Sequence, residues 1–284
     1  MYTVDKSRPV NPITLEVLAA LHAVAAAHQI PYFVIGAMAR DLLMAHVFGI
    51  AAGRATRDVD FAIALEDWSQ FEVIKQAFID TGIFQSQPNE MHRLYYDPVR
   101  NGSAYPLDLI PFGKIASATE TIAWPPDMAV IMNVAGYKEA LQHATRIDVG
   151  AGLIINVISI PALVVLKILA WNDRGLEVNK DAQDLLFLLR HYHEAGNTNR
   201  LYEEAISLME SCGFAIDLAG AALLGYDTSL IVEESTRRAI LGVLDEPVKR
   251  DRLTIHMSSS TGRDAAIAAS FIDQFERGLK LGKL

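Results

Sequence analysis

The chain has 284 residues, of which 51% are hydrophobic and 21% charged, so it is long and apolar enough to bury a sizeable core. Its net charge of −9 argues against a protein that coats nucleic acid by overall positive charge, although a local basic groove stays open. The single cysteine, Cys212, excludes an internal disulfide framework, and the sequence carries neither a signal-peptide pattern nor a convincing membrane span. We therefore expect a soluble, cytoplasmic protein with no membrane partner.

The first part of the chain mixes predicted helices with predicted strands. Apolar side chains recur at helical spacing in some segments, and short β-branched or aromatic runs bounded by turn residues separate them. In chain order the predicted elements are a helix at 12–29, a strand at 32–35, a helix at 37–48, a strand at 59–65, a helix at 67–82 and strands at 91–97 and 105–113. The last two strands are joined by "PVRNGSA", whose Asn-Gly is typical of a hairpin turn, and short β segments are expected to continue through 136–159.

After Pro161 the patterns are helical. The predicted helices lie at 161–173, 181–195, 199–212, 217–225, 229–245 and 264–279. Strands mixed with helices, followed by helices alone, indicate an α+β fold with a mixed β-sheet and flanking helices at 1–160, and an all-helical domain at 161–284.

Asp58 and Asp60 stand two residues apart at the start of the predicted strand "VDFAIAL". Side chains at this spacing share one face of a strand, so the two carboxylates repel unless a cation lies between them. Mg²⁺ is a suitable cation, because it accepts a few carboxylates and completes its shell with water and phosphate oxygens. The alternative is that both are solvated acids at a strand start.

Asp108 lies inside the apolar strand "YPLDLIPFG". Burying a neutral polar group without a hydrogen bond costs roughly 2–7 kcal/mol, and burying an unpaired carboxylate costs more. Asp108 therefore needs a partner. Beside the Asp58 strand it could complete a cluster of three carboxylates that holds two metal ions. The alternative is an ion pair with Arg93 or Arg57.

The segment "VIGAMARDL" places Gly36 between a strand and a helix, where free backbone N–H groups suit a phosphate. Together, "VIGAMAR", "TRDVDFAI" and "LDLIPFG" resemble the three motifs of the DNA polymerase β-type nucleotidyltransferases. "KILAWNDRG" and "NKDAQDLLFLL" further resemble motifs of the AbiEii-type abortive-infection nucleotidyltransferase toxins and their uncharacterised relatives, so that the resemblance spans roughly residues 30 to 192. It departs from the superfamily pattern at Ala37, where Gly or Ser is usual.

The resemblance implies a role for each matched residue of the metal site. Asp58, Asp60 and Asp108 would hold Mg²⁺ (or Mn²⁺), and Asp108 would also help to activate the attacking hydroxyl. Gly36 and Ala37 would bind phosphate through their backbone, and a hydroxyl that could bind phosphate is missing at Ala37.

Three further residues are implied to bind or support the nucleotide: Arg40, Lys167 and Asp181. From the residues alone, Lys167 on an apolar helix indicates an anionic partner, because burying an uncompensated charge is costly. The alternative is a lysine whose stem is buried and whose ammonium reaches water. Asp181 and Asp184 could equally lie on a solvated helix face near its N-terminus.

The resemblance therefore implies a metal-dependent nucleotidyltransferase that moves a nucleoside monophosphate from an NTP to an acceptor hydroxyl. The acceptor would be an RNA such as tRNA, or a protein, and the chain would be a toxin with a cognate antitoxin. One alternative is a degenerate nucleotidyltransferase fold that only binds nucleotide or another protein, which Ala37 favours. A second is an Asp-x-Asp glycosyltransferase, although that class does not require the third acid or the glycine turn.

Overall fold

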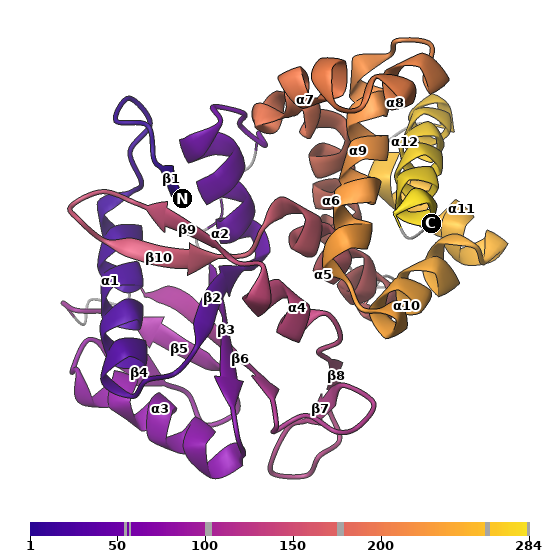
Figure 1. The fold of residues 1–284 in the computed structure, drawn as a ribbon. Helices are drawn as coiled ribbons and strands as arrows, with labels where there is room; N and C mark the ends of the chain where they lie inside the picture. The colour runs from indigo at the N-terminus through magenta and orange to yellow at the C-terminus, as the bar shows by residue number, and fades with distance from the viewer. Residues whose placement is uncertain (54–55, 57, 100–103, 175–178, 259–261, 283–284) are drawn as a thin grey trace. The chain divides into compact units, whose positions relative to one another are not determined.

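The computed structural model describes residues 1–53, 56, 58–99, 104–174, 179–258 and 262–282. The chain forms two compact units, residues 1–159 and 160–284, which we describe separately (Figure 1). The first unit contains a mixed sheet with flanking helices, and only helices are found among the described residues of the second. The predicted fold class is therefore confirmed.

Unit 1 is built around a mixed sheet. Its strands are β1 (Tyr2–Thr3), β2 (Tyr32–Ile35), β3 (Val59–Leu65), β4 (Phe84–Ser86), β5 (Arg93–Tyr96), β6 (Tyr105–Gly113), β7 (Thr121–Ala123), β8 (Ile131–Asn133), β9 (Thr145–Asp148) and β10 (Ile154–Val157). Within the described residues, eight of them form one sheet in the order β1-β9-β10-β2-β3-β6-β5-β4, and β7 pairs with β8. The neighbours β3 and β6 are parallel, whereas β2 is antiparallel to β3, and β5 to β6.

The three central strands are predictable because they are short apolar runs. All four residues of β2 are buried, and β3 and β6 bury most of their side chains. The acids interrupt this apolar pattern where β3 begins and in the first half of β6, which places both at the same end of two parallel strands.

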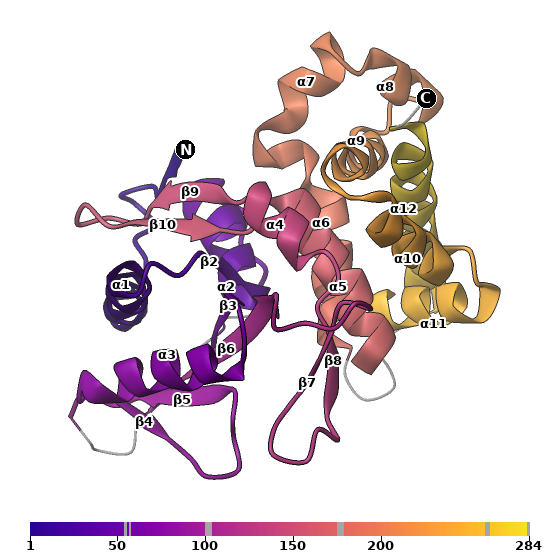
Figure 2. The same cartoon turned by 60° about the horizontal axis from the view of Figure 1, so that its bottom comes forward.

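The helices of unit 1 are α1 (Pro12–Ala27), α2 (Gly36–Asp41), its π-helical continuation η1 (Leu42–Val47), α3 (Trp68–Asp80) and α4 (Tyr137–Gln142). Helix α3 begins at the predicted cap, because the Asp67 carboxylate accepts a hydrogen bond from the backbone N–H of Gln70 at 2.9 Å. Helices α1 and α3 lie side by side in both views (Figures 1 and 2).

The prediction of β segments through 136–159 is only partly right. Strands β9 and β10 lie there, but the segment starts with α4, which follows Gly136 at a φ of 82°. The predicted Asn-Gly turn at 101–102 lies outside the described residues, while the strands on either side of it, β5 and β6, do pair antiparallel.

Unit 2 consists of helices around an apolar interior. They are α5 (Ile160–Arg174), α6 (Lys180–His191), the π-helical η2 (His193–Asn197), α7 (Thr198–Glu203), α8 (Ile206–Ser211), α9 (Ile216–Ile231), α10 (Glu234–Leu244), α11 (Pro247–Ser258) and α12 (Gly262–Leu281). The helix predicted at 199–212 is in fact two, α7 and α8, and the one predicted at 229–245 is divided between the end of α9 and α10. None of the helices in the described part of the chain combines the length and the apolar character that crossing a bilayer requires.

Candidate active site

Gly36 and Asp60 touch at the junction of β2 and α2. Ile35, the last residue of β2, is the register partner of Asp60 in β3, so the turn at Gly36 begins beside the Asp60 side chain. Gly36 has a φ of +70°, and a Cβ built on it would lie 1.9 Å from Oδ2 of Asp60. The turn therefore requires glycine for two reasons, the backbone conformation and the space that the carboxylate occupies.

Asp60 and Asp108 are brought together by the sheet. They are register partners on the parallel neighbours β3 and β6, so their side chains leave the sheet on the same face. Asp58 lies exposed, two residues before Asp60 and just outside β3. The site thus contains two acids fixed by strand pairing and a third at the mouth of the strand.

Asp108 has a cationic partner. The guanidinium of Arg93 donates from Nε to Oδ1 at 2.6 Å and from Nη2 to Oδ2 at 2.8 Å, so both carboxylate oxygens accept a hydrogen bond. The register of β5 and β6 places Arg93 directly opposite Asp108. Hydrogen bonding to Asp108 raises the pKa of Arg93 above its ordinary value, although partial burial opposes this. The sequence-based alternative of an Arg93 ion pair is therefore confirmed, whereas Arg57 lies outside the described residues.

The three acids do not form a ready-made metal centre. Among the described residues, no group of three or more His, Cys, Asp or Glu side chains is arranged to hold a metal ion. The donors nevertheless suit Mg²⁺ or Mn²⁺, because they are carboxylates and both ions prefer oxygen ligands. The metal site built on Asp58, Asp60 and Asp108 stays a prediction.

The two other residues that follow Gly36 differ in accessibility. Ala37 is half-buried at the first turn of α2, whereas Arg40 is only 1% exposed. The guanidinium of Arg40 donates to Oδ1 of Asp41 from Nε at 2.8 Å and from Nη2 at 2.6 Å. Arg40 is thus a buried guanidinium paired with the partly exposed Asp41, and a direct nucleotide contact would require it to turn outward.

Lys167 and Asp181 meet within unit 2. The ammonium Nζ of Lys167 on α5 lies 2.8 Å from Oδ1 of Asp181 and 2.7 Å from Oδ2 of Asp184, both on α6. All three side chains are buried. The anionic partner that Lys167 was predicted to need is therefore supplied by the chain itself. Both alternatives, a lysine that reaches water and acids on a solvated helix face, are wrong.

The charge on Lys167 is fixed by this arrangement. Burial alone would lower the pKa of its ammonium, but the carboxylates of Asp181 and Asp184 outweigh burial and raise that pKa above its ordinary value. Arg174 adds a further cation, with Nη2 3.1 Å from Oδ2 of Asp181. The cluster ties α5 to α6, and a phosphate contact from Lys167 stays a prediction.

A glycine turn packs on the acid of one strand, and another acid lies in register on the neighbouring strand, as the resemblance to nucleotidyltransferases leads us to expect. The family comparison agrees with this class: the model described as "Nucleotidyl transferase AbiEii toxin, Type IV TA system" matches residues 18–264. The chain therefore belongs to the AbiEii nucleotidyltransferase family. This membership confirms the predicted family and enzyme class.

The chain is also similar to solved structures, at low identity. The antibiotic-resistance factor ANT(2″)-Ia is 12% identical at a TM-score of 0.35, covering 70% of this chain and 97% of that one. An antigenic nucleotidyltransferase-like protein from Paracoccidioides brasiliensis is 17% identical at a TM-score of 0.40, with 69% and 89% covered. The Thermotoga maritima CCA-adding enzyme, complexed with tRNA, is 12% identical at a TM-score of 0.28, with 97% and 83% covered. Similarities this weak assign no substrate and no residue role to this chain, and no curated protein matches it.

Sequence reasoning found Arg93 only as one of two candidate partners for Asp108. The feature that distinguishes Arg93 from Arg57 is the register of the β5–β6 pair. Once β5 and β6 pair antiparallel across the turn, their register alone sets Arg93 against Asp108. That register depends on the turn geometry, which the sequence does not fix by its Asn-Gly alone.

Proposed function

We propose that this nucleotidyltransferase transfers a nucleoside monophosphate from an NTP to an acceptor hydroxyl with the help of Mg²⁺ or Mn²⁺. The observation that carries the proposal is the register of Asp60 and Asp108 on parallel strands, with the backbone of Gly36 packed against the Asp60 carboxylate. Phosphate transfer needs anionic ligands for a metal next to a backbone turn that can take phosphate, and these residues supply both.

In this proposal Asp58 and Asp60 would hold the metal, which when bound neutralises the phosphate charge and polarises the phosphorus–oxygen bonds. The backbone at Gly36 and Ala37 would orient the triphosphate. The acceptor oxygen attacks the α-phosphorus, the bond from that phosphorus to the bridging oxygen breaks, and pyrophosphate leaves. Asp108 would accept the proton of the attacking hydroxyl, directly or through water.

Three finer assignments belong to the same proposal. Lys167 would contact a phosphate, Asp181 would support it, and the acceptor would be an RNA such as tRNA or a protein hydroxyl. The family description names a toxin of a type IV toxin–antitoxin system, which supports a growth-inhibiting role opposed by a cognate antitoxin.

Incubation of the full chain with each α-labelled NTP, Mg²⁺ and either total cell RNA or total protein tests the proposal. We expect label to enter one class of acceptor, with pyrophosphate released in equal amount. The Asp60→Asn variant should transfer no label, because its neutral amide is a far weaker metal ligand of similar shape. If no NTP labels any acceptor, while metal-dependent NTP binding persists, the degenerate binding module is the better description.

Induced expression of the chain in a growing bacterial culture tests the toxin role separately. Growth arrest by the wild-type chain, and its absence with Asp60→Asn at equal protein level, is the expected result. Arrest by both variants would instead indicate an effect unrelated to nucleotidyl transfer.

A further inference from the structure

Arg93, Asp108 and Asp60 form a row across three neighbouring strands. Arg93 on β5 is the register partner of Asp108 on β6, which is in turn the register partner of Asp60 on β3. Directly opposed residues on adjacent strands project to the same face of the sheet. The row therefore places a guanidinium on the face that carries the candidate metal ligands.

The geometry of the Arg93–Asp108 pair matters for what Arg93 can bind. Its two hydrogen bonds, 2.6 and 2.8 Å long, present the guanidinium as a fork to a pair of oxygens. A phosphate offers the same two-oxygen arrangement, so the fork that fits Asp108 also fits a phosphate. The Arg93 side chain is 29% exposed and that of Asp108 is 13% exposed, so an incoming ligand can reach the pair.

We propose that Arg93 is a phosphate-binding residue of the candidate site, and that Asp108 and the triphosphate compete for its guanidinium. This inference rests on the proposed function. Without nucleotide, Arg93 neutralises Asp108 and its positive charge disfavours a divalent cation there. When a triphosphate arrives, Arg93 turns to it and Asp108 becomes available to the metal and to the acceptor hydroxyl.

Competition for one side chain predicts effects of opposite sign on two ligands. Arg93→Gln removes the positive charge from Asp108, so Mn²⁺ alone should bind several-fold more tightly. The same change removes a charged phosphate contact, so inorganic triphosphate in the presence of Mn²⁺ should bind about tenfold more weakly, which corresponds to about 1.4 kcal/mol. Inorganic triphosphate serves as the probe because the base of the NTP is not assigned.

Asp108→Asn tests the same competition without altering Arg93. It weakens the hold on the guanidinium, so triphosphate in metal-free buffer should bind more tightly than it binds to the wild-type chain. Mn²⁺ alone should bind more weakly, because a carboxylate is lost. A residue with a purely structural role would weaken every ligand together in both variants.

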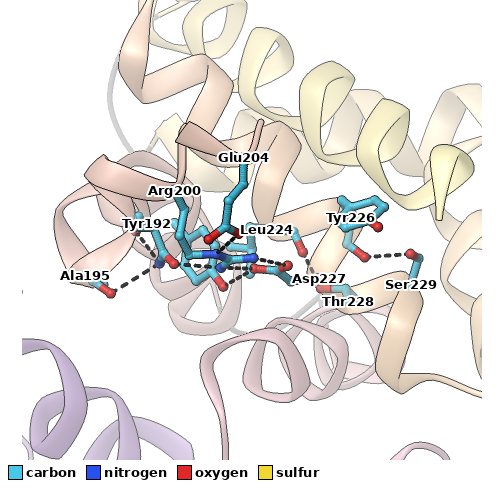
Figure 3. A network of polar contacts seen from close by, with 10 residues as sticks. Tyr192, Ala195, Arg200, Glu204, Leu224, Tyr226, Asp227, Thr228 and Ser229 are labelled. Carbon is cyan, nitrogen blue, oxygen red and sulfur yellow. Dashed lines mark hydrogen bonds and ion pairs between the residues drawn. The ribbon is translucent and has the colours of Figure 1, made fainter. Parts of the chain in front are cut away.

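A second ion pair in the chain provides a matched control. In unit 2, Arg200 donates to both carboxylate oxygens of Asp227, at 2.8 and 2.9 Å (Figure 3). Its side chains are 35% and 12% exposed, close to the values for Arg93 and Asp108. Arg200→Gln therefore removes a similar two-oxygen pair, together with the Arg200 contacts to Asn197 and Glu204, at residues that the proposal does not use. It should lower the melting temperature without changing either ligand affinity relative to the wild-type chain.

The measurements are the free Mn²⁺ signal in electron paramagnetic resonance and titration calorimetry with inorganic triphosphate, on the full chain and the three variants. Opposite shifts for Arg93→Gln, together with tighter metal-free triphosphate binding to Asp108→Asn, support the inference. Unchanged triphosphate affinity in Arg93→Gln, or weaker Mn²⁺ binding to it, overturns the inference while the proposed function stands. If the wild-type chain binds neither Mn²⁺ nor triphosphate, the proposed function itself fails.

Discussion

Two features require glycine at position 36: its backbone conformation and the nearby side chain of Asp60. Its φ of +70° is unfavourable for any side chain, and the space where a Cβ would go is filled by the Asp60 carboxylate. A turn that only glycine can make is what allows the first candidate ligand to lie against the first turn of α2. The sequence motif therefore reflects a steric requirement of the site.

Gly36→Ala should lower the free energy of unfolding by more than the roughly 1–2 kcal/mol that a left-handed conformation costs alanine, because Asp60 must also move. Gly82→Ala is the matched control, since Gly82 has a φ of +78° but, among the described residues other than its two chain neighbours, none lies within 4 Å of where its Cβ would be. Denaturant unfolding of both variants isolates the contribution of the Asp60 contact. Equal losses would show that Asp60 yields freely and that the close approach has no energetic weight.

Lys167 shows why a buried charge must be considered together with its partners. Lys167→Met removes the ammonium that Asp181 and Asp184 both contact in a buried cluster, so we expect a loss of about 3–5 kcal/mol in unfolding free energy, the range for breaking a buried ion pair. Lys75→Met is the control, because Lys75 is equally buried but its Nζ donates to the neutral carbonyl of Met91 at 2.8 Å. It should cost distinctly less in the same denaturant titration.

A triple variant separates the charge of Lys167 from the packing of its aliphatic stem. Adding Asp181→Asn and Asp184→Asn to the Lys167→Met variant should restore part of the lost stability, because it removes the two negative charges that the Lys167 ammonium balanced. No recovery would indicate that packing of the lysine stem, and not the ion pair, is what the single substitution removes.

At the scale of elements, the local pattern predicts strands and caps but not their pairing. The strand at 32–35 and the strand at 59–65 have the predicted bounds, because each is a short apolar run between turn residues. The predicted contact of Arg93 with Asp108 required the register of β5 and β6, which depends on tertiary structure. The candidate acids were singled out from their spacing and their apolar surroundings, whereas Arg93 was only one of two possible partners of Asp108.

Helix α11 is an element that the sequence pattern does not predict at all. Its sequence "PVKRDRLTIHMS" is crowded with charged residues, and only Leu253, Thr254, Met257 and Ser258 are buried. A buried stripe confined to the second half of a helix gives no clear periodicity, so the sequence predicts no helix there. Helix α4 was missed for another reason, because its six residues, Tyr137–Gln142, are too few for a helical period to be recognised.

Helices α9 and α12 lie side by side in unit 2 and approach so closely that glycine is needed at their contact (Figure 1). A Cβ on Gly225 would lie 1.9 Å from the carbonyl oxygen of Phe275, and one on Gly278 would lie 1.9 Å from that of Ala222. Backbone oxygens cannot rotate away as a flexible side chain can. The two glycines therefore set the distance between the helices.

Gly225→Ala should destabilise the chain by about 1–3 kcal/mol, the usual range for overpacking, despite the better helix propensity of alanine. Gly242→Ala on α10 gives the contrast, because within the described part of the chain nothing beyond its chain neighbours and the backbone of its own helix lies within 4 Å of its Cβ position. That substitution should raise stability by roughly 0.5–1 kcal/mol. Urea unfolding of both variants compares the signs directly, and a gain in both would mean that the helices separate without cost.

At the scale of the whole molecule, ligand binding at the proposed site should change the stability of the folded chain, whereas the glycine contacts and buried ion pairs above act without ligand. A ligand that binds only the folded chain stabilises it by about 2.7 kcal/mol at a hundredfold excess over Kd, whatever the site costs the free protein. Asp58 and Asp60 carry like charges two residues apart, and their mutual repulsion opposes folding when no metal is bound. Stability with and without ligand therefore distinguishes a metal site from ordinary acids at a strand start.

The double variant Asp58→Asn with Asp60→Asn tests this distinction. Asparagine keeps the shape of both side chains, including the fit of residue 60 against Gly36, and removes two like charges. We expect the melting temperature without ligand to be kept or raised, by the equivalent of about 1 kcal/mol at most, while the increase produced by Mg²⁺ and NTP is lost. Differential scanning calorimetry of the wild-type and double-variant chains measures both quantities. A full Mg²⁺–NTP shift in the double variant would refute the metal site and return Asp58 and Asp60 to the role of solvated acids that begin β3.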